Sequence, residues 1–350
     1  MEKTKKLRFA IIGCGFWAGY QLPAWLEVEG IEIAALYNRT LSRAKELGDR
    51  YNIANCYDDA EKMFANEALD FADIITDADT HEHFTLMAAN YGVPVICQKP
   101  MAPSLQAAKK MIDACNAAGI PFYIHENFRW QAPVRRLKAV LDSGIIGNVF
   151  KARVSFCSAF PVFDNQPFLA ELDKFIITDI GSHILDVCRF LFGEVNTLYC
   201  VTQTVNQKIK GEDVANVLMK MQNGLHCYAE MSYASLLEKE SFPETLAVVE
   251  GSEGSLQLLH DGVLKITTKK GTETMVAKPV MYDWIDPAYA VVHSSIVDCN
   301  RNILEALQKK GTAETTGADN FETVKLVWAA YDSAKENKVI QMNEYVKSEK

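Results

Sequence analysis

An aspartate and a histidine four residues apart have the side chains and the spacing that acid–base chemistry needs. Asp179 and His183 lie in the stretch from Thr178 to Gly193, whose apolar pattern predicts a helix that ends at Gly193. This spacing places both side chains on one face of the helix, with Asp186 three residues beyond His183. Two interpretations stay open: a reactive site that uses both groups, or a helix start capped by Asp179 with a hydrogen-bonded histidine behind it.

Lys99 is a third candidate, because of its place after a predicted strand. The run from Val95 to Cys97 is short and apolar, and Gln98-Lys99-Pro100 follows it directly. Parallel sheets bind ligands at the carboxyl ends of their strands, and proline fixes the backbone beside it. We therefore expect Lys99 to point into a ligand crevice, although a solvated surface lysine is the plainer alternative.

A motif near the start of the chain, G-x-G-x-x-A, could hold a cofactor. Gly13, Gly15 and Ala18 follow the first apolar run, Arg8 to Ile12. Gly13 would allow a tight turn, Gly15 would let the backbone approach a pyrophosphate, and Ala18 would let the next helix pack on the sheet. The phosphates would sit at the N-terminus of that helix. An ordinary strand-to-helix turn would also use glycine, but the position after the first strand favours a dinucleotide site.

The choice of dinucleotide depends on the end of the second β-type run, at Asn38. An acidic residue there would bind both ribose hydroxyls, repel a 2′-phosphate and so indicate NAD. Asn38 is neutral, Arg39 and Arg43 add positive charge, and Thr40 adds a donor. This combination favours NADP. The alternative is that both arginines are solvated and Asn38 binds a plain ribose.

Composition excludes several classes of function. A chain of 350 residues with 49% hydrophobic and 23% charged residues predicts a large core and more than one domain. A net charge of -9 argues against nucleic acid as a partner, so a small molecule is expected. The N-terminal apolar run is too short for a signal peptide or a membrane span, which predicts a cytoplasmic protein with no membrane partner.

No metal site is predicted. The nine cysteines are scattered and form no C-x-x-C pair, which argues against both a disulfide framework and a zinc site. His81 and His83 are two residues apart and would point to different sides of a helix. We expect this stretch to be a loop and helix start beside the cofactor.

The first half of the chain alternates short β-type runs with helical stretches up to about residue 125, which predicts a doubly wound parallel (Rossmann) sheet. The predicted domain covers residues 1–127. Its predicted strands are 9–12, 33–36, 71–76, 93–97 and 121–125.

The second half predicts an α+β domain, residues 128–316, with a large, mostly antiparallel open sheet. A short helix (133–141), a strand from about residue 149 and an aromatic loop (156–175) precede a meander of strands between residues 197 and 276. A long helix (289–307) follows, and a last helix, about 317–337, is expected to pack back on the first domain. A sheet face without helices needs cover, which predicts a homo-oligomer, a dimer or tetramer, through this sheet.

Four motifs together resemble the glucose-fructose oxidoreductase and inositol dehydrogenase (Gfo/Idh/MocA) family of NAD(P)-dependent dehydrogenases, over nearly the whole length. They are Gly13 to Ala18, Gln98-Lys99-Pro100 where the family usually has Glu-Lys-Pro, Asp179 to His183 with Asp186, and Thr316 to Asp319. Segments 97–102, 125–131, 208–213 and 242–246 are most similar to the D-apiose dehydrogenase group, which oxidises a branched pentose at its anomeric carbon.

The resemblance implies reversible hydride transfer between a nicotinamide and a sugar or polyol hydroxyl. His183 would be the base, Lys99 would stabilise charge on the reacting oxygen, and Asp179 would orient His183 or the substrate. Gln98 lacks the carboxylate that the family usually has beside this lysine, so the influence of the neighbouring residue on Lys99 stays open. The residues expected to bind cofactor are Gly13, Gly15, Phe16, Trp17, Ala18, Asn38, Arg39, Arg43, Thr76, His81, Gln98 and Lys99. Those expected to bind substrate are Lys99, Asn127, Arg129, Trp130, Asp164, Gln166, Asp179 and His183.

Two other functions stay open. The same fold serves NAD-dependent glycosidases, which release a sugar with no net change in the cofactor. A non-catalytic protein that senses the cofactor is the third possibility, although such a protein has no need for the lysine, the aspartate and the histidine together.

Overall fold

The computed structural model describes residues 6–345, which form two compact units. The first unit contains the residues up to Glu126 together with Ile296–Glu322, and the second contains Asn127–Ser295 together with the residues from Thr323 onward. Each unit has its own sheet and its own core. Among the described residues, no helix has the length and apolar character needed to cross a membrane.

The sheet of the first unit is parallel throughout, in the order β3-β2-β1-β4-β5-β6. The predicted doubly wound sheet is thereby confirmed. The strand β3 was not predicted, because two residues carry no readable pattern. The elements are β1 (Leu7–Ile12), α1 (Ala18–Leu26), β2 (Ile31–Tyr37), α2 (Leu41–Tyr51), β3 (Cys56–Tyr57), α3 (Ala60–Asn66), β4 (Phe71–Ile74), α4 (Ala78–Asn90), β5 (Val95–Gln98), α5 (Leu105–Ala117) and β6 (Phe122–His125).

Aromatic rings hold the middle of this sheet together. Phe9 on β1 stacks on Phe71 on β4 with ring centroids 4.4 Å apart, and Trp25 of α1 packs on both rings. All three side chains are fully buried, which stabilises the fold by about 1.5–3 kcal/mol for each large apolar side chain. The carboxyl ends of β1 and β4 are therefore fixed next to each other.

The sheet of the second unit has the order β14-β13-β12-β11-β7-β10-β9-β8-β15. The meander is interrupted, because β7 inserts between β11 and β10 and pairs in parallel with β10; the other pairs are antiparallel. The strands are β7 (Val149–Cys157), β8 (Val195–Gln203), β9 (Val214–Met221), β10 (His226–Ser232), β11 (Leu246–Gly251), β12 (Gly254–Leu258), β13 (Val263–Thr268), β14 (Gly271–Val276) and β15 (Ile340–Gln341).

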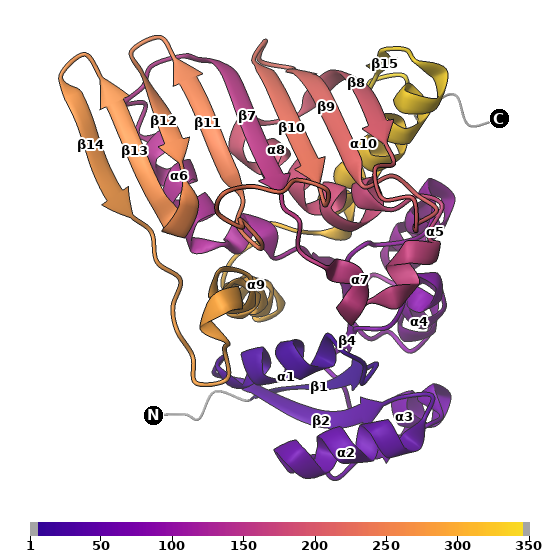
Figure 1. Cartoon of the computed structure of the whole chain (residues 1–350). Coiled ribbons are helices and arrows are strands. Elements are labelled where there is room, and N and C mark those ends of the chain that lie inside the picture. Colours follow the sequence, from indigo (N-terminus) through magenta and orange to yellow (C-terminus); the bar gives the residue numbers. More distant parts are fainter. Residues whose placement is uncertain (1–5, 346–350) are drawn as a thin grey trace. The chain divides into compact units, whose positions relative to one another are not determined.

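Helices cover one face of this sheet and leave the other exposed (Figure 1). α6 packs on β12 and β13, and α8 packs on β7 and β10. The helical elements of this part of the chain are η1 (Phe128–Trp130), α6 (Ala132–Asp142), α7 (Val162–Asn165), η2 (Pro167–Glu171), η3 (Ile177–Gly181), α8 (Ser182–Phe192), η4 (His260–Gly262), η5 (Pro287–Tyr289), α9 (Ala290–Leu307) and α10 (Gly317–Glu336). The predicted 156–175 loop thus contains two short helical turns.

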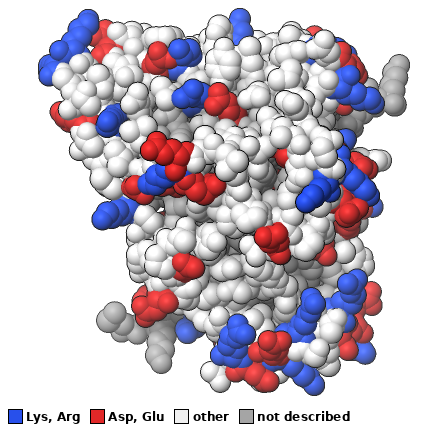
Figure 2. All heavy atoms as spheres, viewed as in Figure 1, with Lys and Arg blue, Asp and Glu red and all other residues white. Residues whose placement is uncertain are grey.

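The exposed face carries a row of side chains from adjacent strands. Tyr228 on β10 pairs in register with Leu218 on β9, which pairs with Tyr199 on β8. On its other side, Tyr228 pairs with Arg153 of β7, which in turn pairs with Val248 of β11. Figure 2 shows this side of the sheet with wide uncharged areas between scattered charged groups.

The last helix contributes to both units. Its residues up to Glu322 belong to the first unit, whereas those from Thr323 onward belong to the second. There Ser333 Oγ accepts a hydrogen bond from the amide of Cys200 on β8 at 2.9 Å. The sequence-based expectation placed all of this helix on the first domain, because its apolar face does not reveal which partner it contacts.

Candidate active site

The carboxyl edge of the parallel sheet collects residues expected to bind a dinucleotide. The strand order reverses between β1 and β4, which is where doubly wound sheets bind ligands. Gly13 turns the chain after β1 with a φ of +108°, and a Cβ there would lie 2.8 Å from the Ile75 carbonyl oxygen. The other predicted residues that end or follow a strand at this edge are Asn38, Thr76, Gln98 and Lys99.

The turn into α1 has room for a phosphate group. A Cβ added to Gly15 would meet no atom within 4 Å, and no side chain caps the N-terminus of α1. Ala18 is fully buried where the helix begins, whereas the Phe16 side chain is 58% exposed. Amides at a helix N-terminus favour an anion, so the turn from Gly13 to Ala18 fits the pyrophosphate of a nicotinamide dinucleotide.

Asn38 braces this turn through its side chain. Its Oδ1 accepts a hydrogen bond from the amide of Cys14 at 3.0 Å, and its Nδ2 donates to the Thr40 carbonyl at 3.0 Å. Arg39 and Arg43 are exposed, and neither forms an ion pair within residues 6–345. Both guanidinium groups are therefore open to solvent.

His81 lies inside the unit and joins two loops of the sheet edge. Its Nε2 is 2.9 Å from the Thr76 carbonyl oxygen, and its Nδ1 is 3.1 Å from that of Pro100 and 3.2 Å from that of Met101. Burial lowers the pKa of His81. The hydrogen bonds to these carbonyls raise it and offset part of this shift. The ring thus ties the turn after β4 to the turn that carries Lys99.

His83, two residues further along α4, is exposed. The two imidazoles therefore diverge, as their spacing predicts. No group of three or more metal-ligating side chains gathers anywhere in residues 6–345.

His183 lies near the start of α8, which continues a turn of π-helix, Ile177–Gly181. Its side chain is 4% exposed and stacks on Phe128 with ring centroids 3.8 Å apart and planes 10° apart. The stacking fixes the plane of the imidazole. The helix ends at Gly193, as predicted, with a φ of +89°.

Asp179 lies within the π-helical turn, and its amide donates to the Phe175 carbonyl at 2.9 Å. The interpretation of Asp179 as a helix cap is therefore wrong, because a cap would precede the first helical turn. Tyr233 Oη donates to Asp179 Oδ2 at 3.3 Å. Burial, together with the nearby Asp179 carboxylate, raises the pKa of Tyr233 well above its ordinary value. Tyr233 therefore stays protonated and holds the carboxylate, a role that the sequence did not reveal.

Glu212 supports the start of the same π-helical turn. Its carboxylate accepts from the amides of Phe175 at 3.3 Å and Ile177 at 3.2 Å, and from Tyr331 Oη at 2.8 Å. Burial, and secondarily Glu212, raises the pKa of Tyr331 far above its ordinary value. Glu212 lies in the segment 208–213 that carried part of the resemblance, but nothing in the sequence connects it to Asp179.

Two residues expected to contact substrate have internal partners. Arg129 is 5% exposed and forms two hydrogen bonds with the Asp186 carboxylate, Nε to Oδ2 at 2.8 Å and Nη2 to Oδ1 at 2.6 Å. Thr323 Oγ1 donates to the same carboxylate at 3.1 Å. Asn127 is 2% exposed, and its Nδ2 donates to Ser295 Oγ at 2.8 Å. These contacts give both residues structural roles.

The remaining candidates for substrate binding lie apart along the chain. The guanidinium of Arg135 packs over the Trp130 ring at 4.2 Å from its centroid. Asp164 is exposed on α7, and Gln166 follows it at the start of the next turn.

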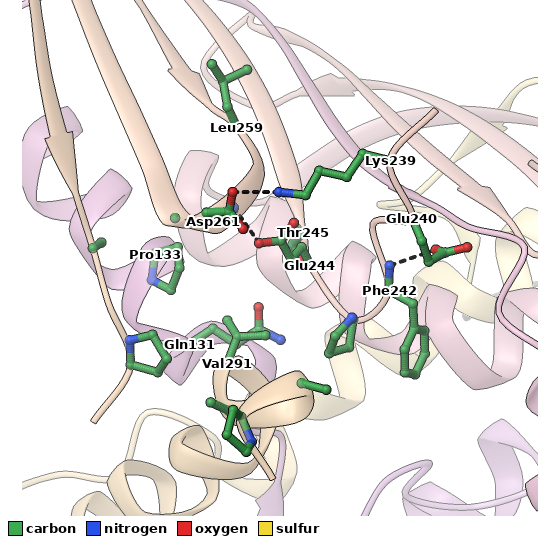
Figure 3. Close-up of a pocket in the computed structure, with 17 residues that line it drawn as sticks. Gln131, Pro133, Lys239, Glu240, Phe242, Glu244, Thr245, Leu259, Asp261 and Val291 are labelled. Atoms are coloured by element: carbon green, nitrogen blue, oxygen red, sulfur yellow. Dashed lines mark hydrogen bonds and ion pairs between the residues drawn. The ribbon is translucent and has the colours of Figure 1, made fainter. Parts of the chain in front are cut away.

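The second unit also contains a cavity of about 320 Å³ (Figure 3). Lys239 and Asp261 form an ion pair of 2.5 Å in its wall, and Glu244 accepts from His260 Nδ1 at 2.8 Å. Gln131 Nε2 is buried there without a hydrogen-bond partner among the described residues. None of the residues that the sequence predicts for substrate lines this cavity, so we do not assign the reaction to it.

Comparisons with known proteins cover nearly the whole chain and agree with the two sheets described above. Residues 7–125 match the oxidoreductase family with an NAD-binding Rossmann fold, and residues 134–257 match the GFO/IDH/MocA C-terminal domain. The D-apiose dehydrogenase of Rhizobium rhizogenes is 43% identical over 337 residues, 96% of this chain and 98% of that protein.

Solved structures give the same result. An oxidoreductase from Agrobacterium radiobacter, in complex with NAD+, L-tartaric acid and magnesium, superposes with a TM-score of 0.95 at 43% identity and covers 97% of this chain and 99% of that one. A levoglucosan dehydrogenase in complex with NADH and levoglucosan has a TM-score of 0.83 at 18% identity, covers 97% of this chain and all of that one, and shares the fold.

Removing Arg129 should destabilise the second unit strongly. Arg129→Met would leave the buried Asp186 carboxylate without its cation, and such a change costs about 3–5 kcal/mol. Urea unfolding followed by fluorescence measures this loss. The matched control is Lys138→Met, which removes an ion pair with the exposed Asp142 and should cost about 0–1 kcal/mol. Equal losses for the two variants would contradict the structural role of Arg129.

Proposed function

Because this chain belongs to the Gfo/Idh/MocA family of NAD-binding oxidoreductases, we propose that it is a sugar dehydrogenase whose substrate is D-apiose. The observation that carries the proposal is the 43% identity to a D-apiose dehydrogenase over 96% of the chain. The reaction removes a hydride from the anomeric carbon and a proton from its hydroxyl, which gives a lactone. The nicotinamide supplies the acceptor for the hydride.

The assigned residues have different roles in this reaction. In the first unit the turn from Gly13 to Ala18 would hold the pyrophosphate, and Lys99 would hydrogen-bond the reacting oxygen, so that it stabilises negative charge as the proton leaves. In the second unit His183 takes the proton, since an imidazole has the pKa that a base needs near neutral pH. Phe128 fixes the plane of that ring, and Asp179, held by Tyr233, orients the substrate or the imidazole.

A screen of aldoses and polyols, followed by nicotinamide absorbance, tests this function. We expect D-apiose to be oxidised with the highest kcat/KM and unbranched pentoses more slowly. Release of a free sugar from a glycoside without a change in absorbance would instead indicate a glycosidase. Binding of cofactor with no turnover of any sugar would indicate a sensing protein.

Variants in the same assay test the assigned residues. His183→Ala and Lys99→Met should each lower kcat by about 10²–10⁴-fold, the usual contribution of a positioned acid–base or charge-stabilising group. The matched controls are His83→Ala and Lys109→Met, both exposed in the first unit, which should leave kcat unchanged. Activity of the first two variants within a few-fold of wild type would show that other residues carry the reaction.

We further propose that the chain uses NADP as well as NAD. Asn38 brings no charge that would repel a 2′-phosphate, and the exposed guanidinium groups of Arg39 and Arg43 can pair with one. The NAD+ complex of the Agrobacterium radiobacter oxidoreductase supports use of the unphosphorylated cofactor by a close relative.

The ratio of kcat/KM for the two cofactors tests this choice. We expect a ratio within about tenfold, or 1.4 kcal/mol, in either direction. Asn38→Asp with Arg39→Ala should then shift the ratio toward NAD by more than tenfold, because the pair adds a repelling carboxylate and removes the partner of the phosphate. Arg50→Ala, an exposed arginine at the end of α2, is the control. A wild-type preference for NAD far above tenfold would overturn the role of Arg39.

The exposed face of the large sheet is the proposed interface between copies of the chain. Tyr228 is 43% exposed and Leu218 is 40% exposed, side by side in the middle of that face. An uncovered sheet face that exposes large apolar side chains is typical of an interaction surface. Tyr228→Lys with Leu218→Lys should lower the mass measured by light scattering to that of one chain. Leu236→Lys, on a loop side chain that is 91% exposed, should leave the mass unchanged. A monomeric wild type would refute the interface.

A further inference from the structure

A single buried carboxylate orients several amide side chains in the first unit. Asp73 on β4 has no exposed surface, and its Oδ2 accepts hydrogen bonds from Trp25 Nε1 at 2.7 Å and Gln21 Nε2 at 3.1 Å. Burial raises the pKa of Asp73 to about 6, although these two hydrogen bonds lower it and offset part of the shift. Asp73 is therefore largely ionised at neutral pH and acts as an acceptor.

Trp25 and Asp73 together decide which way the Gln21 amide faces. An indole N–H can only donate and an ionised carboxylate can only accept, so the Gln21 atom beside Asp73 must be the donor Nε2. The Gln21 Oε1 then faces Gln98, whose Nε2 donates to it at 3.3 Å. Gln98 is 7% exposed, so water cannot readily replace this partner.

A second branch reaches the next strand. Gln21 Nε2 also donates to Asn300 Oδ1 at 3.1 Å, and His125 Nε2 lies 3.0 Å from the same oxygen. Because that oxygen is an acceptor, His125 carries a proton on Nε2. Gln98 and His125 are register partners at the ends of β5 and β6. One carboxylate on β4 thus sets hydrogen-bond directions at the carboxyl ends of two further strands.

We propose that Asp73 is a positioning residue for Lys99, acting through Gln21 and Gln98. Lys99 directly follows Gln98, so a fixed Gln98 side chain fixes the end of β5 from which the lysine projects. This inference rests on the proposed function, in which Lys99 contacts the reacting oxygen. Asp73 itself touches neither substrate nor cofactor in it.

The arrangement excludes a carboxylate at position 98 while Asp73 is ionised. In Gln98→Glu, an acceptor would face the Gln21 Oε1, which is also an acceptor. Rotation of the Gln21 amide would relieve that contact but would turn the same oxygen toward Asp73. Buried acceptors that face each other cost far more than one lost hydrogen bond. The substitution therefore disturbs the strand end although it changes the side-chain volume very little.

Trp25 keeps this direction when the charge at position 73 is removed. The same atom, Asp73 Oδ2, accepts from both Trp25 Nε1 and Gln21 Nε2, so in Asp73→Asn the oxygen of the new amide must lie at that place. Asp73→Asn therefore preserves the hydrogen-bond directions as far as Gln98. Asp73→Leu has a similar volume but no acceptor, so it removes them.

The test compares Asp73→Asn, Asp73→Leu and Gln98→Glu, with kcat and KM measured for D-apiose and for the cofactor. We expect Asp73→Leu and Gln98→Glu to lower kcat at least tenfold while the KM for the cofactor changes less than threefold. Asp73→Asn should keep kcat within threefold of wild type, because it keeps the acceptor. An unchanged kcat in Asp73→Leu or in Gln98→Glu, or an equal loss of kcat in Asp73→Asn and Asp73→Leu, would overturn the inference.

Thermal unfolding of the same four proteins separates positioning from folding. Gln98→Met, which is neutral, serves where Gln98→Glu does not fold, and it should lower kcat with little change in melting temperature. Losses in melting temperature without losses in kcat would leave a structural network and overturn the positioning role. A wild type that oxidises no sugar would refute the proposed function and this inference with it, whereas an active wild type with variants of unchanged kcat refutes the inference alone.

Discussion

The ion pair between Arg129 and Asp186 is the interaction on which the candidate residues of the second unit depend. Both side chains are almost fully buried, so each charge is tolerated only because the other is present. Asp186 lies one turn after His183 on α8, while Arg129 follows Phe128, the ring on which His183 stacks. The pair therefore fixes the helix and the stacking ring relative to each other. Thr323 of α10 adds a third attachment to the same carboxylate.

Local patterns in the sequence predicted the parts of the structure that depend on neighbouring residues. The turn at Gly13 and the end of α8 at Gly193 both follow from residue types within a few positions. The π-helical turn did not, because it depends on Glu212, more than thirty positions away. The internal partners of Arg129 and Asn127 were missed for the same reason, since 57 and 168 positions separate them from Asp186 and Ser295.

Sequence patterns also identify residue types better than residue roles. His81 was predicted to lie beside the cofactor, and the structure places its ring between the Thr76 and Pro100 carbonyls, inside the edge that the cofactor would approach. Asn38 was predicted to bind cofactor, and its amide is engaged with Cys14 and Thr40. In both cases a polar side chain near a binding edge first satisfies backbone groups, because a buried or constrained amide or carbonyl needs a partner. Such residues shape a site even where they do not touch its ligand.

The two edges of the nine-stranded sheet differ from its open face in what they can bind. At one edge β14 (Gly271–Val276) carries Thr272, Glu273 and Thr274, with Lys269 and Lys270 just before it. At the other edge β15 is only two residues long. Charged or very short edge strands resist the addition of a further strand from another molecule. Growth of the sheet into a continuous fibre through its edges is thereby discouraged.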